Sequence, residues 1–122
     1  MAKAEKKKLV LVVDDQERVL RFIEIDLKLR GFEVATATSG QGALELAKAL
    51  QPDIVLLDIV MPGMDGFEVL KKLRSFTKLP VIAFSASVSN HGEAIRLGAS
   101  DFISKPFNVN ELAGRMKAVL NC

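Results

Sequence analysis

Short apolar runs alternate along the chain with longer segments in which apolar residues recur at helical spacing. Residues 9–13, 54–57 and 81–84 are continuous apolar runs bounded by turn signals, which is typical of parallel strands buried on both faces of a sheet. Residues 33–37 and the short pair 102–103 add two further predicted strands. The pattern therefore predicts five strands, each followed by a helical segment.

The first predicted helix covers residues 17–30, with Val19, Phe22, Ile23 and Leu27 on one apolar stripe. The same periodicity predicts four more helices. One ends before Gln51-Pro52, one begins at Phe67, one spans residues 89–97, and the last follows the cap residue Asn108. The segment 89–97 is the weakest of these because a glycine lies inside it and Ser and Asn residues flank it.

Alternation of five strands with five helices predicts an α/β fold. Its architecture would be a doubly wound five-stranded parallel sheet with five helices, arranged as a three-layer αβα sandwich. The chain has 122 residues, which fits one domain with its own core. We expect a basic flexible leader over residues 1–8 and the folded domain over residues 9–121.

The net charge of +2 and the single cysteine narrow the classes of function. Much of the positive excess lies in the leader, and a short lysine tract before a first strand is usually a solvated tail, so we expect no direct nucleic-acid binding. No apolar stretch reaches membrane-spanning length, so we expect no membrane anchor and a cytoplasmic location. Cys122 stands alone and offers neither an internal disulfide nor a metal site.

Polar residues stand where the apolar runs end: Asp14 and Asp15, Asp58, Ser85 and Lys105. Ligands of open parallel sheets bind at the carboxyl ends of the strands. If the first and third strands are neighbours, carboxylates about 4 Å apart repel by roughly 4 kcal/mol per pair at an effective dielectric of about 20, so they need a proton or a cation. Hard oxygen ligands suit Mg²⁺, which leaves coordination positions open for a phosphoryl group. Lys105 and Ser85 suit the phosphoryl oxygens, and the remaining carboxylate can act as the nucleophile.

Each of these residues also has an ordinary structural interpretation. An aspartate after a strand is commonly a helix cap. Taken singly, Ser85 is typical of a loop serine, and Lys105 before a proline is typical of an exposed lysine. His91 lies in a polar segment, where we expect it to face solvent, and we assign it no role. Only the joint arrangement indicates a site.

Motifs distributed along the whole chain are similar to those of a known family. They are the acidic pair Asp14-Asp15, the segment DIVMPGMDG at 58–66, Ser85-Ala86, and GASDF at 98–102 leading into Lys105-Pro106-Phe107. With these motifs the chain resembles a response-regulator receiver domain from Leu9 to about Leu120. The resemblance implies the strand order 2-1-3-4-5 and a phosphorylation switch in a two-component system.

The resemblance assigns the phosphoacceptor and the metal ligands. Asp58 would take a phosphoryl group from a phosphohistidine on a histidine kinase or a histidine phosphotransfer protein. Mg²⁺ would be held by Asp15, Asp58 and the backbone carbonyl of Val60, while Asp14 would act through metal-bound water.

The resemblance also implies a conformational switch. Lys105 would contact a phosphoryl oxygen, and its peptide bond to Pro106 would be cis. Ser85 would move toward the phosphoryl group, and Phe102 would turn from outside to inside, which would change the surface of the C-terminal half. Because phenylalanine has no hydroxyl, its rotamer would depend on packing alone, and a plain core phenylalanine is the alternative.

Ile25 and Leu29 lie four residues apart, off the main apolar stripe of the first helix. Receivers generally dock partners through this helix, so the pair is a candidate kinase-docking surface, and scattered surface apolar residues are the alternative. Downstream, the resemblance implies an effector or an output domain, and a phosphorylation-dependent homodimer stays open. By the resemblance, Val60 and Ser87 occupy family positions that would tune phosphoryl lifetime, and they predict no specialised acceleration of self-dephosphorylation.

Three rival classes fit the residues less well. A flavin-binding electron carrier needs a phosphate loop after the first strand, where Asp14-Asp15 would repel the phosphate. An aspartyl phosphatase would place a second aspartate two residues after Asp58, where Val60 stands, so we expect no enzyme that turns over a separate substrate. A degenerate receiver would lack part of the acidic pair, the acceptor or the lysine. The remaining alternative is a receiver that acts mainly through protein–protein interaction independent of phosphorylation.

Overall fold

The structure is a computed structural model that describes residues 7–120. Most of the predicted leader therefore lies outside the described residues, as do Asn121 and Cys122, while Lys7 and Lys8 are exposed. Within this range the strands are β1 (Leu9–Val13), β2 (Glu33–Ala37), β3 (Ile54–Asp58), β4 (Val81–Ser85) and β5 (Asp101–Ser104). The helices are α1 (Glu17–Leu29), α2 (Gly40–Leu50), α3 (Gly66–Phe76), α4 (Asn90–Arg96) and α5 (Val109–Leu120).

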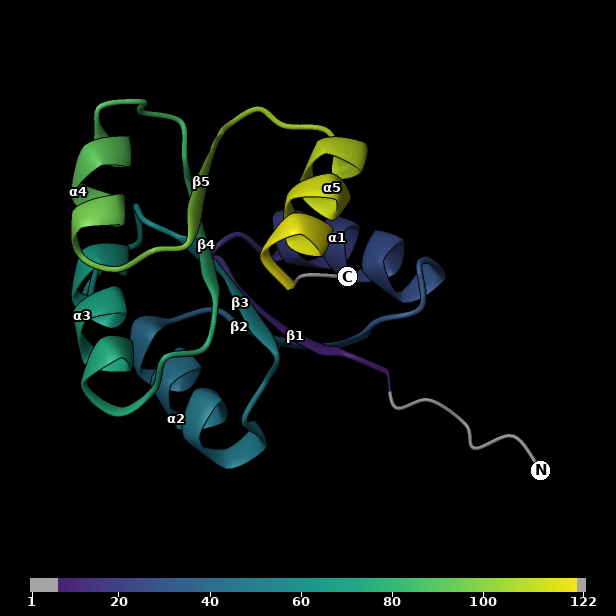
Figure 1. The fold of residues 1–122 in the computed structure, drawn as a ribbon, viewed down its shortest axis with the longest axis horizontal. Coiled ribbons are helices and arrows are strands. Elements are labelled where there is room, and N and C mark those ends of the chain that lie inside the picture. Colours follow the sequence, from purple (N-terminus) through teal and green to yellow (C-terminus); the bar gives the residue numbers. More distant parts are fainter. Residues whose placement is uncertain (1–6, 121–122) are drawn as a thin grey trace.

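The strands form one parallel sheet in the order β2-β1-β3-β4-β5, which confirms the predicted strand order. Helices α1 and α5 cover one face of the sheet, and α2, α3 and α4 cover the other (Figure 1). The predicted doubly wound three-layer αβα sandwich is thus confirmed. The carboxyl ends of all five strands point to the same edge, because every pair in the sheet is parallel.

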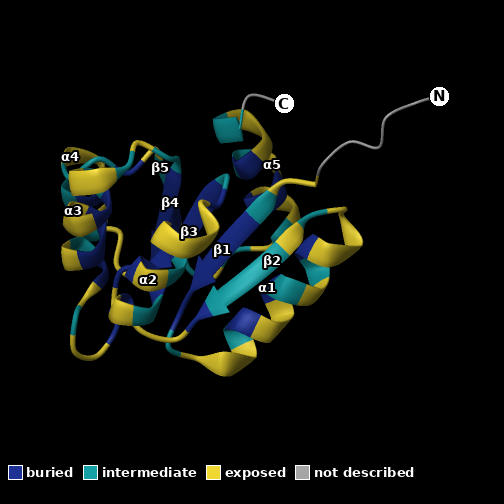
Figure 2. Ribbon diagram, turned by 90° about the horizontal axis from the view of Figure 1, so that it is seen from below, coloured by how far each residue is buried: buried dark blue, intermediate teal, exposed yellow. Residues whose placement is uncertain are grey.

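The core is divided by the sheet into two apolar layers. Val10 and Val12 pack with α1 and α5, whereas Leu11 and Val13 pack with the helices on the opposite face. Strands β3 and β4 are fully buried and the edge strand β2 is only partly buried, as Figure 2 shows. Continuous apolar sequence in the central strands is therefore explained by burial on both faces.

The apolar stripe of α1 differs from the prediction. Leu20, Ile23 and Leu27 enter the core, whereas Phe22 is 61% exposed. Successive helical residues project about 100° apart, so a helix that buries Ile23 against the sheet turns Phe22 away from it. Placing Phe22 on the core stripe was wrong, and its exposure matters for the site described below.

Three helices begin directly after a polar residue that caps their N-terminus. Side-chain oxygens of Ser39, Asp65 and Asn108 accept hydrogen bonds of 3.1, 3.0 and 2.7 Å from the N–H groups of Gly42, Glu68 and Glu111. The predicted cap at Asn108 is therefore confirmed. Helix α4 is different: it has seven residues, shorter than the predicted 89–97, no side-chain cap, and Ala94 as its single buried residue.

Candidate functional site

The register of the sheet brings the predicted site residues to one place. Asp58 and Ser85 are the last residues of β3 and β4, while Asp14 and Lys105 directly follow β1 and β5. The pairs that set this register are Val13 with Leu57, Asp58 with Phe84, and Ser85 with Ser104. Residues separated by up to 91 positions in the sequence therefore meet at the carboxyl edge of the sheet.

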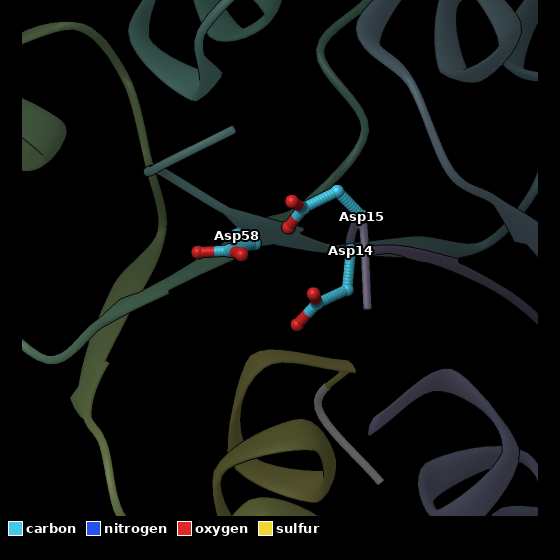
Figure 3. A group of neighbouring side chains, drawn as sticks. All are labelled: Asp14, Asp15 and Asp58. Carbon is cyan, nitrogen blue, oxygen red and sulfur yellow. The ribbon is translucent and has the colours of Figure 1, made fainter. Parts of the chain in front are cut away.

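Three carboxylates converge at this edge. Asp14, Asp15 and Asp58 each place one oxygen within 4.8 Å of the others, and Figure 3 shows the three side chains gathered at the ends of their strands. Asp14 is fully buried and Asp58 is 4% exposed, while Asp15 is more accessible. Backbone N–H groups of Gln16 and Val60 donate to Asp14 Oδ1 at 2.9 Å and to Asp58 Oδ1 at 3.2 Å, which fixes both carboxylates.

The electrostatic environment of Asp58 opposes its ionisation. The pKa of Asp58 is raised from 3.8 to about 6, mainly by burial, next by the negative charge of Asp14, and to a smaller extent by that of Asp15. The Lys105 ammonium and the Val60 N–H act in the opposite direction and lower this pKa. Asp58 is therefore mainly ionised at neutral pH, in a site whose charge a bound cation would relieve.

Lys105 supplies the positive charge of the site. Its Nζ lies 3.3 Å from Asp14 Oδ2 and 3.6 Å from Asp58 Oδ2, and 5.1 Å from the centre of the Phe84 ring. The peptide bond between Lys105 and Pro106 is cis. The ammonium thus stands between the two buried carboxylates, although it follows a different strand from either.

The Ser85 hydroxyl is held on the side of α4. Its Oγ accepts hydrogen bonds from the Ser87 N–H at 3.1 Å and from Asn90 Nδ2 at 2.9 Å. Ser85 itself is 1% exposed. Sequence reasoning missed Asn90, because a lone asparagine near a helix start gives no signal that its side chain turns back toward a strand.

Phe102 is not turned outward in this structure, which corrects the expectation for its starting position. The side chain is 5% exposed and packs in the core layer that faces α4. The ring of His91 stacks on it, with 5.1 Å between ring centres and 8° between ring planes. His91 is exposed but does more than face solvent, because it covers the aromatic ring.

An apolar groove lies beside the acidic site. It has a volume of about 450 Å³ and includes Val19 and Phe22 of α1 together with Lys105, Pro106 and Phe107. Two further apolar side chains of α1, Ile25 and Leu29, are 56% and 82% exposed. Phe22, Ile25 and Leu29 are spaced by three and four residues, so they share one face of the helix. Sequence reasoning found the last two and missed Phe22, which lines the groove together with Lys105.

The site fits a hard divalent cation. Its three carboxylates form the one cluster of at least three His, Cys, Asp or Glu ligands found within residues 7–120. Oxygen ligands in this number, with the raised pKa of Asp58, suit Mg²⁺, which binds through a few carboxylates and retains other coordination positions. An acceptor carboxylate, an adjacent lysine and a hydroxyl around such a cation are the groups that phosphoryl transfer requires.

Comparison with known proteins agrees with this geometry. The family model for the response regulator receiver domain matches residues 10–117, so the chain belongs to this family. It is a receiver domain of two-component systems, and the family resemblance predicted from the motifs is confirmed.

Individual relatives place the chain within this family. It is 42% identical over 114 residues to the transcriptional regulatory protein KdpE of Mycobacterium tuberculosis, covering 92% of this chain and 50% of KdpE. The receiver domain of the Francisella response regulator 1452 superposes with a TM-score of 0.89 at 33% identity, covering 94% of this chain and 98% of that one. The chemotaxis protein CheY4 of Vibrio cholerae superposes with a TM-score of 0.85 at 31% identity, covering 93% of this chain and 99% of that one.

The chain spans about half the length of the curated relatives it matches. Among the helices of residues 7–120, none combines the length and apolar character that crossing a membrane requires.

Proposed function

We propose that this receiver accepts a phosphoryl group on Asp58 from a phosphohistidine of a partner protein and signals through the surface of its C-terminal half. The observation that carries the proposal is that Asp58 lies 3.6 Å from the Lys105 ammonium and belongs to the cluster of three carboxylates. A buried nucleophile, a fixed positive charge and a carboxylate cluster that could hold a metal are together the groups that phosphoryl transfer requires.

In the proposed reaction an Asp58 carboxylate oxygen attacks the phosphorus of the phosphohistidine. The O–P bond forms as the N–P bond breaks, and the electron pair returns to the imidazole nitrogen, which takes up a proton. Lys105 would stabilise the charge that spreads over the phosphoryl oxygens, and the Ser85 hydroxyl would donate to one of them. The product is an acyl phosphate, which water later hydrolyses to the carboxylate and inorganic phosphate.

Asp15, Asp58 and the Val60 carbonyl would hold Mg²⁺, with Asp14 acting through water. When bound, this cation would neutralise the carboxylates and the phosphoryl oxygens together. Val60 is 63% exposed and apolar, so it offers no group that could position an attacking water. We therefore propose no specialised acceleration of self-dephosphorylation, and no turnover of a separate substrate that would make the domain an enzyme.

The proposed donor is a histidine kinase or a histidine phosphotransfer protein that docks on α1. The groove beside Lys105 and the exposed face formed by Phe22, Ile25 and Leu29 are contiguous along this helix. An apolar helix face that leads to the acceptor suits a helical partner, which would bring its phosphohistidine to Asp58. We propose a cytoplasmic location, because a kinase that draws on ATP would act there.

The proposed output is a downstream effector or an output domain, as the relatives' names as transcriptional regulators suggest. A homodimer formed on phosphorylation is a second form of output. We propose no direct nucleic-acid contact for the receiver, because its described surface interleaves charges of both signs, as in the pairs Arg96 with Glu93 and Arg115 with Asp101.

Intact mass after incubation with acetyl phosphate tests the proposal. We expect a gain of one phosphoryl group in the presence of Mg²⁺ and none in EDTA. An Asp58→Asn variant should gain nothing, whereas Asp26→Asn, which changes an aspartate paired with Arg30 on α1, should behave as the wild type. No gain under any condition would favour the alternative, a module that works through protein–protein interaction independent of phosphorylation.

A further inference from the structure

Two consecutive residues at the start of α4 hold the two side chains through which the site would change shape. Asn90 Nδ2 donates to Ser85 Oγ at 2.9 Å, and the ring of His91 stacks on Phe102 at 5.1 Å. Ser85 ends β4 and Phe102 lies on the neighbouring β5. The first turn of α4 therefore contacts the phosphoryl-accepting site and the aromatic ring at the same time.

We propose that Asn90 is a positioning residue that holds the Ser85 hydroxyl away from the phosphoryl site, and that with His91 it forms a clasp fixing the first turn of α4. This inference rests on the proposed phosphorylation of Asp58. Once Ser85 turns to a phosphoryl oxygen, Asn90 loses its hydrogen-bond partner, and the first turn of α4 is free to leave Phe102.

The surroundings of Ser85 show why Asn90 decides the position of the hydroxyl. Ser85 is 1% exposed, and the lone pairs of its Oγ already receive the Ser87 N–H and the Asn90 amide. The Ser87 contact is local, since it spans two residues within the same turn. The Asn90 contact is the one that joins the hydroxyl to another element of the fold.

Helix α4 is suited to respond, because few of its side chains hold it in place. Its seven residues bury only Ala94, and its N-terminus has no side-chain cap. A short helix with so little buried apolar surface opens at a low free-energy cost. The first turn is held by backbone hydrogen bonds from the Asn90 and His91 N–H groups to the Ser87 and Val88 carbonyls, and by the side-chain contacts of Asn90 and His91. These side-chain contacts join it to the sheet, on the side where Figure 1 shows α4 beside β5.

The test compares the wild type with Asn90→Ala and with Asn110→Ala, in which an exposed asparagine in the first turn of α5 loses a contact to Arg30. Alanine is a better helix former than asparagine, so the Asn90 variant keeps its helix-forming tendency.

The probe is beryllofluoride with Mg²⁺, a phosphoryl mimic followed by fluorine NMR, since the chain has neither tryptophan nor tyrosine for fluorescence. We expect Asn90→Ala to bind beryllofluoride about two- to tenfold more tightly, the value of one hydrogen bond that no longer has to break, and Asn110→Ala to bind as the wild type. Unchanged or weaker binding by Asn90→Ala would overturn the proposal.

Amide hydrogen exchange of residues 90–96 gives a readout that does not depend on phosphorylation. In the ligand-free protein, Asn90→Ala should exchange faster across α4, and it should do so equally in an Asp58→Asn background. His91→Ala should accelerate exchange there as well, whereas His91→Phe should preserve the stacking on Phe102 and the slow exchange. If the wild type binds no beryllofluoride, the proposed function fails while this measurement still decides the clasp. Equal exchange in wild type and Asn90→Ala would refute the proposed clasp.

Discussion

The ammonium of Lys105, which follows β5, lies 3.3 Å from Oδ2 of Asp14, which follows β1, so the two residues form an ion pair. The same ammonium is 3.6 Å from Asp58 Oδ2. Lys105 therefore partly neutralises the oxygens that a divalent cation would bind. In the proposed reaction its position would make it both a partner of the phosphoryl group and a competitor of the metal.

Replacing Lys105 by methionine should separate these two effects. Removing one positive charge about 5 Å from a divalent cation, even at a water-like dielectric of about 80, should tighten Mg²⁺ binding about tenfold. The same change should slow phosphorylation by acetyl phosphate, because the phosphoryl oxygens lose their cation. Titration calorimetry and intact mass measure the two quantities. Weaker Mg²⁺ binding by Lys105→Met would contradict the competition, and Lys117→Met, a lysine in the last turn of α5, serves as the control.

The raised pKa of Asp58 predicts how stability depends on pH in metal-free protein. A folded-state pKa of about 6 against an ordinary 3.8 means that the folded protein binds this proton more tightly than the unfolded chain does. The stabilisation is complete below about pH 4 and is lost as the pH rises through about 6, up to about 3 kcal/mol.

Urea unfolding in EDTA, at several values from about pH 4 to about pH 7, measures this slope. Asp58→Asn should lack this pH dependence of stability and should be more stable than the wild type at neutral pH. Glu45→Gln, on the exposed face of α2, should retain the wild-type slope. Adding Mg²⁺ at neutral pH should stabilise the wild type and leave Asp58→Asn less affected. Parallel pH profiles for wild type and Asp58→Asn would show that burial does not act on this carboxyl.

Gly66 predicts a steric effect on the acceptor strand. A Cβ at this position would lie 2.5 Å from the Asp58 carbonyl oxygen and still closer to Ile59 Cα. Gly66→Ala must therefore displace the backbone at Asp58, the proposed phosphoacceptor, and we expect a loss of about 1–3 kcal/mol in the free energy of unfolding together with slower phosphorylation. Gly114→Ala is the matched control, because nothing lies within 4 Å of its Cβ and alanine should stabilise that helix by up to about 1 kcal/mol. Equal stability of Gly66→Ala and the wild type would contradict the close approach.

The exposed face of α1 predicts separate effects on two phosphoryl donors. Phe22→Glu, and Ile25→Glu combined with Leu29→Glu, should slow transfer from a phosphorylated histidine kinase core by at least about fivefold, because a charge replaces apolar contact area. Phosphorylation by acetyl phosphate should not change, since Asp58 is untouched. Phe76→Glu, an exposed phenylalanine at the end of α3, controls for surface charge. Equal losses with both donors would exclude a docking role for this face.

The sequence alone determined the fold and the composition of the site. Apolar runs at 9–13, 54–57 and 81–84 required strands buried on both faces, and that requirement dictates helices on each side of a parallel sheet. Polar residues directly after those runs had to meet at one edge, because the carboxyl ends of parallel strands lie together. The acidic pair, Asp58, the serine and the lysine were therefore visible in the sequence itself.

Only the tertiary structure decided where side chains without a periodic or positional signal point. Phe22 fitted a helical stripe in sequence, yet the direction in which α1 packs on the sheet turned it outward, beside Lys105. Asn90 and His91 gave no pattern at all, because their partners, Ser85 and Phe102, lie on strands and are reached through the placement of one short helix. Periodicity records which face of an element is buried, whereas contacts between elements depend on how those elements are packed, and that information exists only in three dimensions.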